Sequence, residues 1–362
     1  MDEYIYEISA SEKTTSSAAI QETKTMLYLM GYMNDPSEID AFLIDVFNDV
    51  TAIDENDEKL WDAQSKGEKQ SSPNEIGKNL VTLYKNYISK INFSYYILSF
   101  KDVAQKNLNN DVTKQKIKIL KFSDFTFEAQ KDIQKGLVEE CKAKSYIKID
   151  DDKIDYNEIL NFLNKVYFLL NNDYEESYIK KIAEVKEEII RNDVLKQIFD
   201  EIKSKQMLIK SLSNIEGKKL KTISDVHYLG RTLSIQTINS VILERIIGIN
   251  LIEKNKHQYI IPSSFNSVLA SKSFVDEDEQ SNFLQDCVND VYRLFVNKNS
   301  AKEFWKFINA SIKEIKGNTD KDLFNIYESI YDENNVFFRM TKKESIMYFL
   351  AFLKGGIKSE NL

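Results

Sequence analysis

Proline and glycine are scarce in this chain, which contains 3 Pro and 10 Gly among 362 residues. Proline interrupts helices and strands, and glycine supplies the backbone conformations that tight turns need. A fold built from many short strands and turns is therefore disfavoured, and long helices are expected. A length of 362 residues also exceeds the size at which a single hydrophobic core stops growing, so the sequence predicts two domains.

Composition and charge exclude several classes of protein. Hydrophobic residues make up 42% and charged residues 29% of the chain, which is typical of a globular protein. The formal net charge of −8 excludes a wholly basic nucleic-acid coat but leaves room for a local basic groove. Cys141 and Cys287 lie far apart in sequence, which argues against a disulfide framework and against a zinc site.

The start of the chain, MDEYIYEISASEKTT, is acidic and polar and does not have the pattern of a signal peptide. No apolar run approaches the ~20 residues needed to span a membrane. A cytoplasmic protein without membrane association is expected.

The first part of the chain alternates between helical and strand patterns. This alternation predicts an α/β domain over residues 1–150, with a mixed sheet flanked by helices. Helices are predicted over residues 16–33, 71–89 and 125–144, and strands over 41–54 (two strands and a turn), 59–66, 93–100 and 116–122.

An acidic segment at residues 147–155 marks the predicted boundary, and residues 151–362 are predicted to form a mostly α-helical regulatory or assembly domain. Residues 238–264 are the exception, because a helix is followed there by two short strands around the turn KNKH. A helix followed by a hairpin is the pattern of a winged helix. Lys254 and Lys256 would lie at the tip of that wing and are candidates for nucleic-acid binding.

The stretch LWDAQSKG carries polar residues at alternate positions: Asp62, Gln64 and Lys66. In a strand, all three side chains leave the same face. Asp49 falls where the preceding strand VTAID begins, and Asp45 lies one step earlier. Because neighbouring strands lie about 5 Å apart, we expect Asp49 to face Gln64 across the gap.

These residues are suited to metal-assisted phosphodiester hydrolysis. A hard divalent cation such as Mg²⁺ or Mn²⁺ takes oxygen ligands, and Asp49 and Gln64 are the candidate metal ligands. A lysine beside the metal, here Lys66, holds the attacking water or neutralises charge that builds on the phosphate.

The order of a helix, an Asp, a (D/E/Q)-x-K strand and a second helix resembles the PD-(D/E)XK, or restriction-endonuclease-like, nuclease superfamily. Within it the chain looks most like the double-stranded DNA endonuclease domain of bacterial antiphage effectors, such as those of CBASS and Lamassu systems. The matching residues are Gln21 or Glu22, Asp49, Gln64 and Lys66, and the resemblance covers roughly the first 150 residues. The chain departs from the pattern where Gln64 replaces an acid, and Asp62 on the same face is a candidate to compensate.

The resemblance implies a Mg²⁺-dependent DNA endonuclease, the effector subunit of an antiphage defence system. Asp49, Gln64, Lys66 and Glu22 would be catalytic, with Asp45, Asp62 and Gln21 as secondary candidates. Separately, Lys69 in the lysine-bearing segment after the strand is a candidate DNA contact, because a lysine at a phosphate releases counterions. Such a nuclease has to be restrained. The resemblance therefore also implies control by a partner, an SMC-like or helicase-like ATPase, or by homo-oligomerisation.

Simpler interpretations compete with this one. An Asp at a strand start is ordinarily a turn or cap residue, and D-x-Q-x-K is also the polar face of an edge strand. The alternative function is a non-catalytic nucleic-acid- or protein-binding subunit with a degenerate nuclease fold, which the amide at Gln64 favours.

Overall fold

We describe the protein from a computed structural model. It describes residues 5–8, 15–33, 38–67, 70–109, 117–144, 155–183, 192–212, 214–247, 261–296, 301–317, 322–331 and 341–359. Statements about structure below concern these residues.

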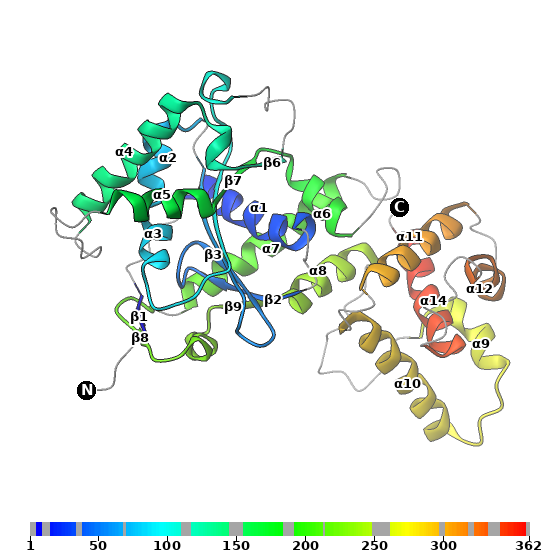
Figure 1. Cartoon of the computed structure of the whole chain (residues 1–362). Helices are drawn as coiled ribbons and strands as arrows, with labels where there is room; N and C mark the ends of the chain where they lie inside the picture. The colour runs from blue at the N-terminus through cyan, green and yellow to red at the C-terminus, as the bar shows by residue number, and fades with distance from the viewer. Residues whose placement is uncertain are drawn as a thin grey trace. The chain divides into compact units, whose positions relative to one another are not determined.

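A mixed seven-stranded sheet organises the first part of the chain (Figure 1), in the order β6-β7-β5-β4-β3-β2-β9. Strands β4, β5 and β7 run parallel to one another, and the remaining neighbours are antiparallel. The strands are β2 (Ile39–Ile44), β3 (Val50–Asp54), β4 (Leu60–Lys66), β5 (Tyr95–Phe100), β6 (Ile117–Leu120), β7 (Val166–Asn171) and β9 (Thr232–Ser234).

Helices cover both faces of this sheet, which confirms the predicted α/β architecture. Helix α1 (Ser16–Tyr32) lies on one face, where Thr25 donates a hydrogen bond to Ser99 of β5. On the other face a hydrophobic core joins apolar side chains of the strands to those of four helices. These helices are α2 (Pro73–Asn79), α3 (Val81–Tyr87), α4 (Phe127–Ala143) and α5 (Tyr156–Lys165).

Local sequence explains how α2 is placed. Ser72 and Glu75 form a reciprocal capping box with Pro73 at the first turn, which is a strong signal for a helix start. Helices α2 and α4 then cross at glycines: a Cβ at Gly77 would lie 2.0 Å from the Ile133 carbonyl oxygen, and a Cβ at Gly136 2.0 Å from that of Asn74. Only glycine permits so close an approach of two helix backbones.

The remaining elements are mostly helical, which agrees with the predicted helical C-terminal region. Strands β1 (Tyr6–Glu7) and β8 (Lys219–Leu220) form a separate antiparallel pair. The helices of more than one turn are α6 (Glu175–Ile182), α7 (Asn192–Leu212), α8 (Ile235–Ile247), α9 (Asn266–Ala270), α10 (Glu277–Val296), α11 (Ala301–Gly317), α12 (Leu323–Tyr331) and α14 (Lys343–Ser359).

The chain divides into two compact units at other positions than residue 150. The first unit comprises residues 1–178 and 199–235, and the second comprises 179–198 and 236–362. The predicted boundary at 150 falls inside the first unit because β7 and β9 both belong to its sheet. The apolar run of β7 directly continues the stripe of α5, and periodicity alone does not distinguish a short buried strand from a helix.

Several predictions from the sequence fall outside the described residues. The predicted hairpin of the winged helix, with Lys254 and Lys256, lies there, and so does Lys69. Helix α8, which would precede the wing, is present. Among the described residues, no helix combines the length and the apolar character that crossing a bilayer requires.

Candidate active site at the edge of the sheet

The β3–β4 hairpin brings Asp49 and Gln64 together, as expected. Val50 pairs with Ala63, which places Asp49 beside Gln64 one step further along the ladder. The Gln64 Nε2 atom donates to Asp49 Oδ2 over 2.7 Å. The same oxygen accepts from the Ser65 backbone amide at 2.7 Å and from the Ser65 hydroxyl at 3.1 Å. Three donors thus converge on one oxygen of Asp49 and fix its orientation.

Helix α3 holds the strand side chains from the other side. Thr82 donates to Gln64 Oε1 at 3.1 Å, and Asn86 donates to Asp62 Oδ2 at 2.7 Å. Positions two apart on a strand are separated by about 7 Å and positions four apart on a helix by about 6 Å. Because these spacings are similar, Thr82 and Asn86 can reach Gln64 and Asp62 at the same time. Asp62 and Gln64 therefore share one face of β4, as their alternation predicts.

Asp62 differs from the expected role, because it lies inside the fold rather than at the site. Its side chain is fully buried. It accepts hydrogen bonds from Asn48 (2.6 Å), Thr51 (2.9 Å) and Asn86. Burial raises the pKa of Asp62 to about 7, although the three donors oppose that shift. With both oxygens occupied, Asp62 anchors the loop that ends in Asp49 to α3, and it does not compensate for the charge missing at Gln64.

Glu22 enters the site from α1 on the opposite face. Its carboxylate is buried, accepts from Gln206 Nε2 at 3.2 Å and forms an ion pair with Lys210 Nζ at 3.5 Å. Burial, together with the nearby charge of Asp49, raises the pKa of Glu22 to about 7, while Lys210 acts in the opposite direction. The negative charge of Asp49 therefore acts on Glu22, although Glu22 lies on α1 and Asp49 directly precedes β3.

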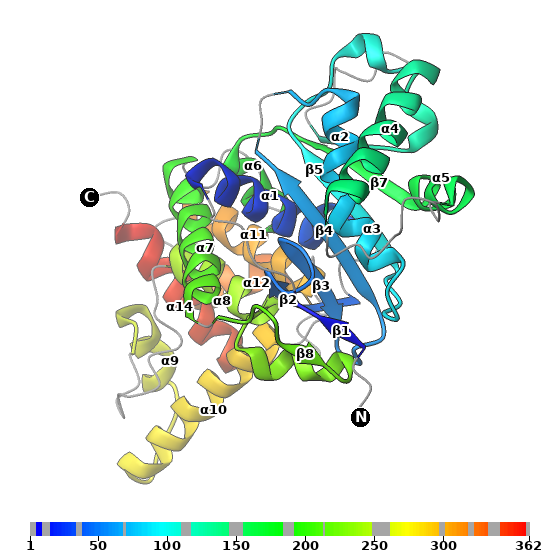
Figure 2. The ribbon, with the colours of Figure 1, turned by 90° about the vertical axis from the view of Figure 1, so that its left-hand side faces the viewer.

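Lys210 supplies an internal positive charge to this acidic group. Its ammonium lies 3.4 Å from Asp45 Oδ1 as well as 3.5 Å from Glu22. Burial lowers the pKa of Lys210, but the carboxylates of Glu22, Asp45 and Asp49 outweigh burial and raise it above the ordinary value. Helix α7, which carries Lys210, lies beside α1 (Figure 2).

Two ambiguities in the sequence are settled by these contacts. Asp45 pairs with Lys210 and with Arg231, whose NH1 lies 3.7 Å from its Oδ2, whereas Asp49 is the acid that meets Gln64. Gln21 faces the sheet, where its amide donates to Ser99 and to the Asn171 carbonyl. Glu22, rather than Gln21, is therefore the α1 residue at the site.

Lys66 is the last residue of β4 and is partly buried. It follows Ser65, whose amide holds Asp49, and strand alternation directs it to the same face as Gln64. Lys66 therefore lies at the carboxyl end of β4, the same strand end at which Gln64 and Ser65 bind Asp49.

Glu22 and Asp49 carry carboxylate oxygens, which are the ligand type that a hard divalent cation takes, and the charge of Asp49 raises the pKa of Glu22. Within the described part of the chain no group of three or more His, Cys, Asp or Glu side chains is arranged to hold a metal ion. Mg²⁺ does not need one, since it binds through one or two carboxylates and keeps several waters. Gln64 points its amide nitrogen at Asp49, so in this geometry it orients that acid.

Sequence reasoning missed Thr82, Gln206, Lys210 and Arg231. Gln206 and Lys210 are four residues apart and therefore share one face of α7, which is a weak signal that a polar surface lies opposite. Nothing local indicated that this surface is α1, because α1 and α7 are about 180 positions apart in sequence, as the contact between Thr23 and Gln206 illustrates.

Comparison of the chain with protein-family models, with curated proteins and with solved structures finds no match.

Proposed function

We propose that this chain is a metal-dependent DNA endonuclease with its active site at Asp49, Gln64, Lys66 and Glu22. The observation that carries the proposal is the fixed carboxylate of Asp49, held by Gln64 and Ser65 at a strand end beside the buried, repelling carboxylate of Glu22. A buried acid whose pKa is raised by burial and by a second acid is a typical feature of functional sites.

In this proposal each residue has a separate role. Asp49 and Glu22 would hold the divalent cation, Mg²⁺ or Mn²⁺, which when bound polarises the phosphate and activates water. Gln64 and Ser65 orient Asp49 through their hydrogen bonds. Lys66 orients the attacking water or neutralises charge that develops on the phosphate.

Helix α7 offers a means of control. It begins in the second unit, which includes residues 179–198, and continues in the first, where Lys210 pairs with Glu22. The Lys210 ammonium would compete with a metal ion for Glu22, the one proposed metal ligand with which it forms an ion pair. Withdrawal of Lys210 would therefore increase the affinity of the site for a metal ion.

The choice of DNA as substrate rests on the resemblance to the PD-(D/E)XK superfamily. On the same basis we propose that the chain is an antiphage effector in the cytoplasm, controlled by an SMC-like or helicase-like ATPase or by self-association. These parts of the proposal depend on the D-x-Q-x-K strand and its surroundings, not on any contact to a partner.

The direct experiment incubates the purified chain with supercoiled plasmid and Mg²⁺ or Mn²⁺, alone and with proteins that co-purify with it. Asp49→Asn and Lys66→Gln are each expected to reduce cleavage at least 100-fold, since each removes a group that acts on the reacting atoms. Matched controls are Asp132→Asn on the exposed side of α4 and Lys59→Gln, whose side chain is 48% exposed and pairs with Glu38; both should cleave as wild type does.

Two observations favour the alternative of a non-catalytic binding subunit. Lys210 already neutralises Glu22 and Asp45, and Gln64 presents nitrogen rather than oxygen to Asp49. If that alternative holds, the protein cleaves no plasmid, binds DNA with equal affinity in the presence of EDTA and of Mg²⁺, and Asp49→Asn leaves that binding unchanged.

A further inference from the structure

A polar cavity lies at the opposite end of the strands from Asp49. It has a volume of about 620 Å³ and is lined by twelve residues. These come from the C-terminal ends of α3 and α5, the loop that leads into β5, and the neighbouring ends of β5, β6 and β7. Strands β4, β5 and β7 are parallel, so their amino ends meet here and the carboxyl end of β4 meets Asp49.

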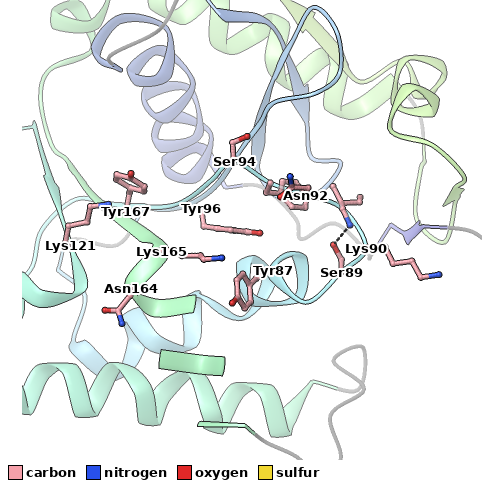
Figure 3. A pocket seen from close by; sticks show the side chains of 12 residues that line it. Tyr87, Ser89, Lys90, Asn92, Ser94, Tyr96, Lys121, Asn164, Lys165 and Tyr167 are labelled. Atoms are coloured by element: carbon pink, nitrogen blue, oxygen red, sulfur yellow. Dashed lines mark hydrogen bonds between the residues drawn. The ribbon is translucent and has the colours of Figure 1, made fainter. Parts of the chain in front are cut away.

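The lining is basic and aromatic. Three of the twelve residues are lysines and none is acidic. Figure 3 shows Lys165 between Tyr96 and Tyr87, and Lys121 beside Tyr167 on the other side of the cavity, whereas Lys90 extends away. The cavity therefore presents two ammonium groups and three tyrosine rings.

The two inward ammoniums rest on aromatic faces instead of on carboxylates. Lys121 Nζ lies 3.1 Å from the centroid of the Tyr167 ring, and Lys165 Nζ lies 5.0 Å from that of Tyr87. Neither lysine pairs with an acid within the described residues. A cation–π contact is weaker than a pairing with a phosphate, so an anionic ligand would draw both ammoniums toward itself.

We infer that this cavity binds a nucleotide, meaning a small phosphate ester that carries a planar base. The phosphate meets Lys121 and Lys165, and the base packs against the tyrosine rings. Ser94, Asn92 and Asn164 in the lining supply donors and acceptors for the edge of the base, whereas the Ser89 hydroxyl is already bonded to the Asn86 carbonyl and the Ile91 amide. A volume of 620 Å³ is in the usual range for small-molecule sites and too small for a nucleic-acid duplex.

The inference does not depend on the proposed nuclease activity. Titration calorimetry of the full chain in EDTA, with ATP, AMP, pyrophosphate and adenosine as separate ligands, tests it without any contribution from metal bound near Asp49. A nucleotide is expected to bind at least tenfold more tightly than either pyrophosphate or adenosine. Equal affinity for pyrophosphate and nucleotide, or no binding of any of the four, would overturn the inference.

Paired variants locate the site. The double variant Lys121→Gln/Lys165→Gln is expected to weaken nucleotide binding by roughly tenfold or more, because it removes both charge-assisted contacts. Its control is Lys131→Gln/Lys135→Gln on α4, where the side chains are 56% and 68% exposed and do not line the cavity. An unchanged affinity in the first variant, or an equal loss in the control, would contradict the assignment. Thermal unfolding of both variants verifies that each remains folded.

Discussion

Asp49, directly before β3, and Asp62, within β4, are two carboxylates of one hairpin, and their surroundings differ. Asp62 is fully buried and both its oxygens accept hydrogen bonds, from Asn48, Thr51 and Asn86. Asp49 lies two ladder steps from Asp62, just before β3 begins, and the side-chain hydrogen bonds found for it among the described residues all go to its Oδ2. Asp62 is therefore enclosed within the fold, whereas Asp49 lies at the end of the strands.

This difference indicates that Asp62 has a structural role and Asp49 a ligand-binding role. A carboxylate whose oxygens are all occupied contributes to the scaffold, whereas one that is oriented by a single oxygen retains the capacity to bind a ligand with the other. Asn48, which donates to Asp62, directly precedes Asp49, so the scaffold acid also fixes the loop that presents the site acid. The predictions below test whether the two roles are separable.

The largest expected effect on stability is that of Asp62→Ala. This change leaves three buried donors without an acceptor, and we expect it to lower the free energy of unfolding by about 3–5 kcal/mol. Asp49→Asn, at the strand end, is expected to lower the free energy of unfolding by less than about 1 kcal/mol. Urea unfolding followed by circular dichroism measures both. Similar losses in the two variants would remove the distinction between scaffold and site.

A smaller effect is expected from the protonation of Glu22. Its pKa is raised from 4.5 to about 7 by burial and by Asp49, so the folded protein holds this proton more tightly than the unfolded chain does. The resulting stability is fully present below pH 4.5 and is lost as the pH rises through 7. Asp62 acts in the same direction.

Glu22→Gln should therefore flatten the decline in stability between pH 5 and 8 in EDTA, by on the order of 1–3 kcal/mol. Glu128→Gln, whose side chain is 80% exposed, is the matched control and should keep the wild-type slope. A slope in Glu22→Gln as steep as that of the wild type would show that Glu22 is ionised throughout this range.

The smallest effect concerns the support of Gln64 by α3. Thr82→Val removes the donor to Gln64 Oε1 and is expected to lower stability by about 1 kcal/mol. Freed from Thr82, the Gln64 amide orients Asp49 less well, so plasmid cleavage should fall severalfold more than stability alone explains. Wild-type cleavage in this variant would mean that the bond between Thr82 and Gln64 serves the fold only.

Much of the first unit was predictable from local pattern. The helix over residues 16–33 and the strands around Asp49 and Gln64 are present, and the hairpin geometry correctly predicted the contact between these two residues. Alternation also placed Asp62 and Gln64 on one face. It could not indicate how deep each position lies, because burial depends on α3 and on the loop, which are packed by tertiary contacts.

The parts that were not predicted depend on long-range contacts. The strand β7 was concealed in an apolar run that continues α5, and the domain boundary was consequently placed too early. Lys210 and Arg231 form ion pairs with Asp45 although they are far from it in sequence. Local sequence spacing cannot predict such contacts. The basic cavity likewise combines side chains from separate loops and helix ends.

The central claim is that Asp49 and Glu22 together form a metal site, and Mn²⁺ binding tests it most directly because it needs neither DNA nor an activating partner. Titration of the wild-type chain with Mn²⁺, followed by electron paramagnetic resonance at pH 8, is expected to show a site that Asp49→Asn and Glu22→Gln each weaken at least tenfold. Asp132→Asn should leave that site intact. No Mn²⁺ binding by the wild type, or equal binding by Asp49→Asn, would contradict the account.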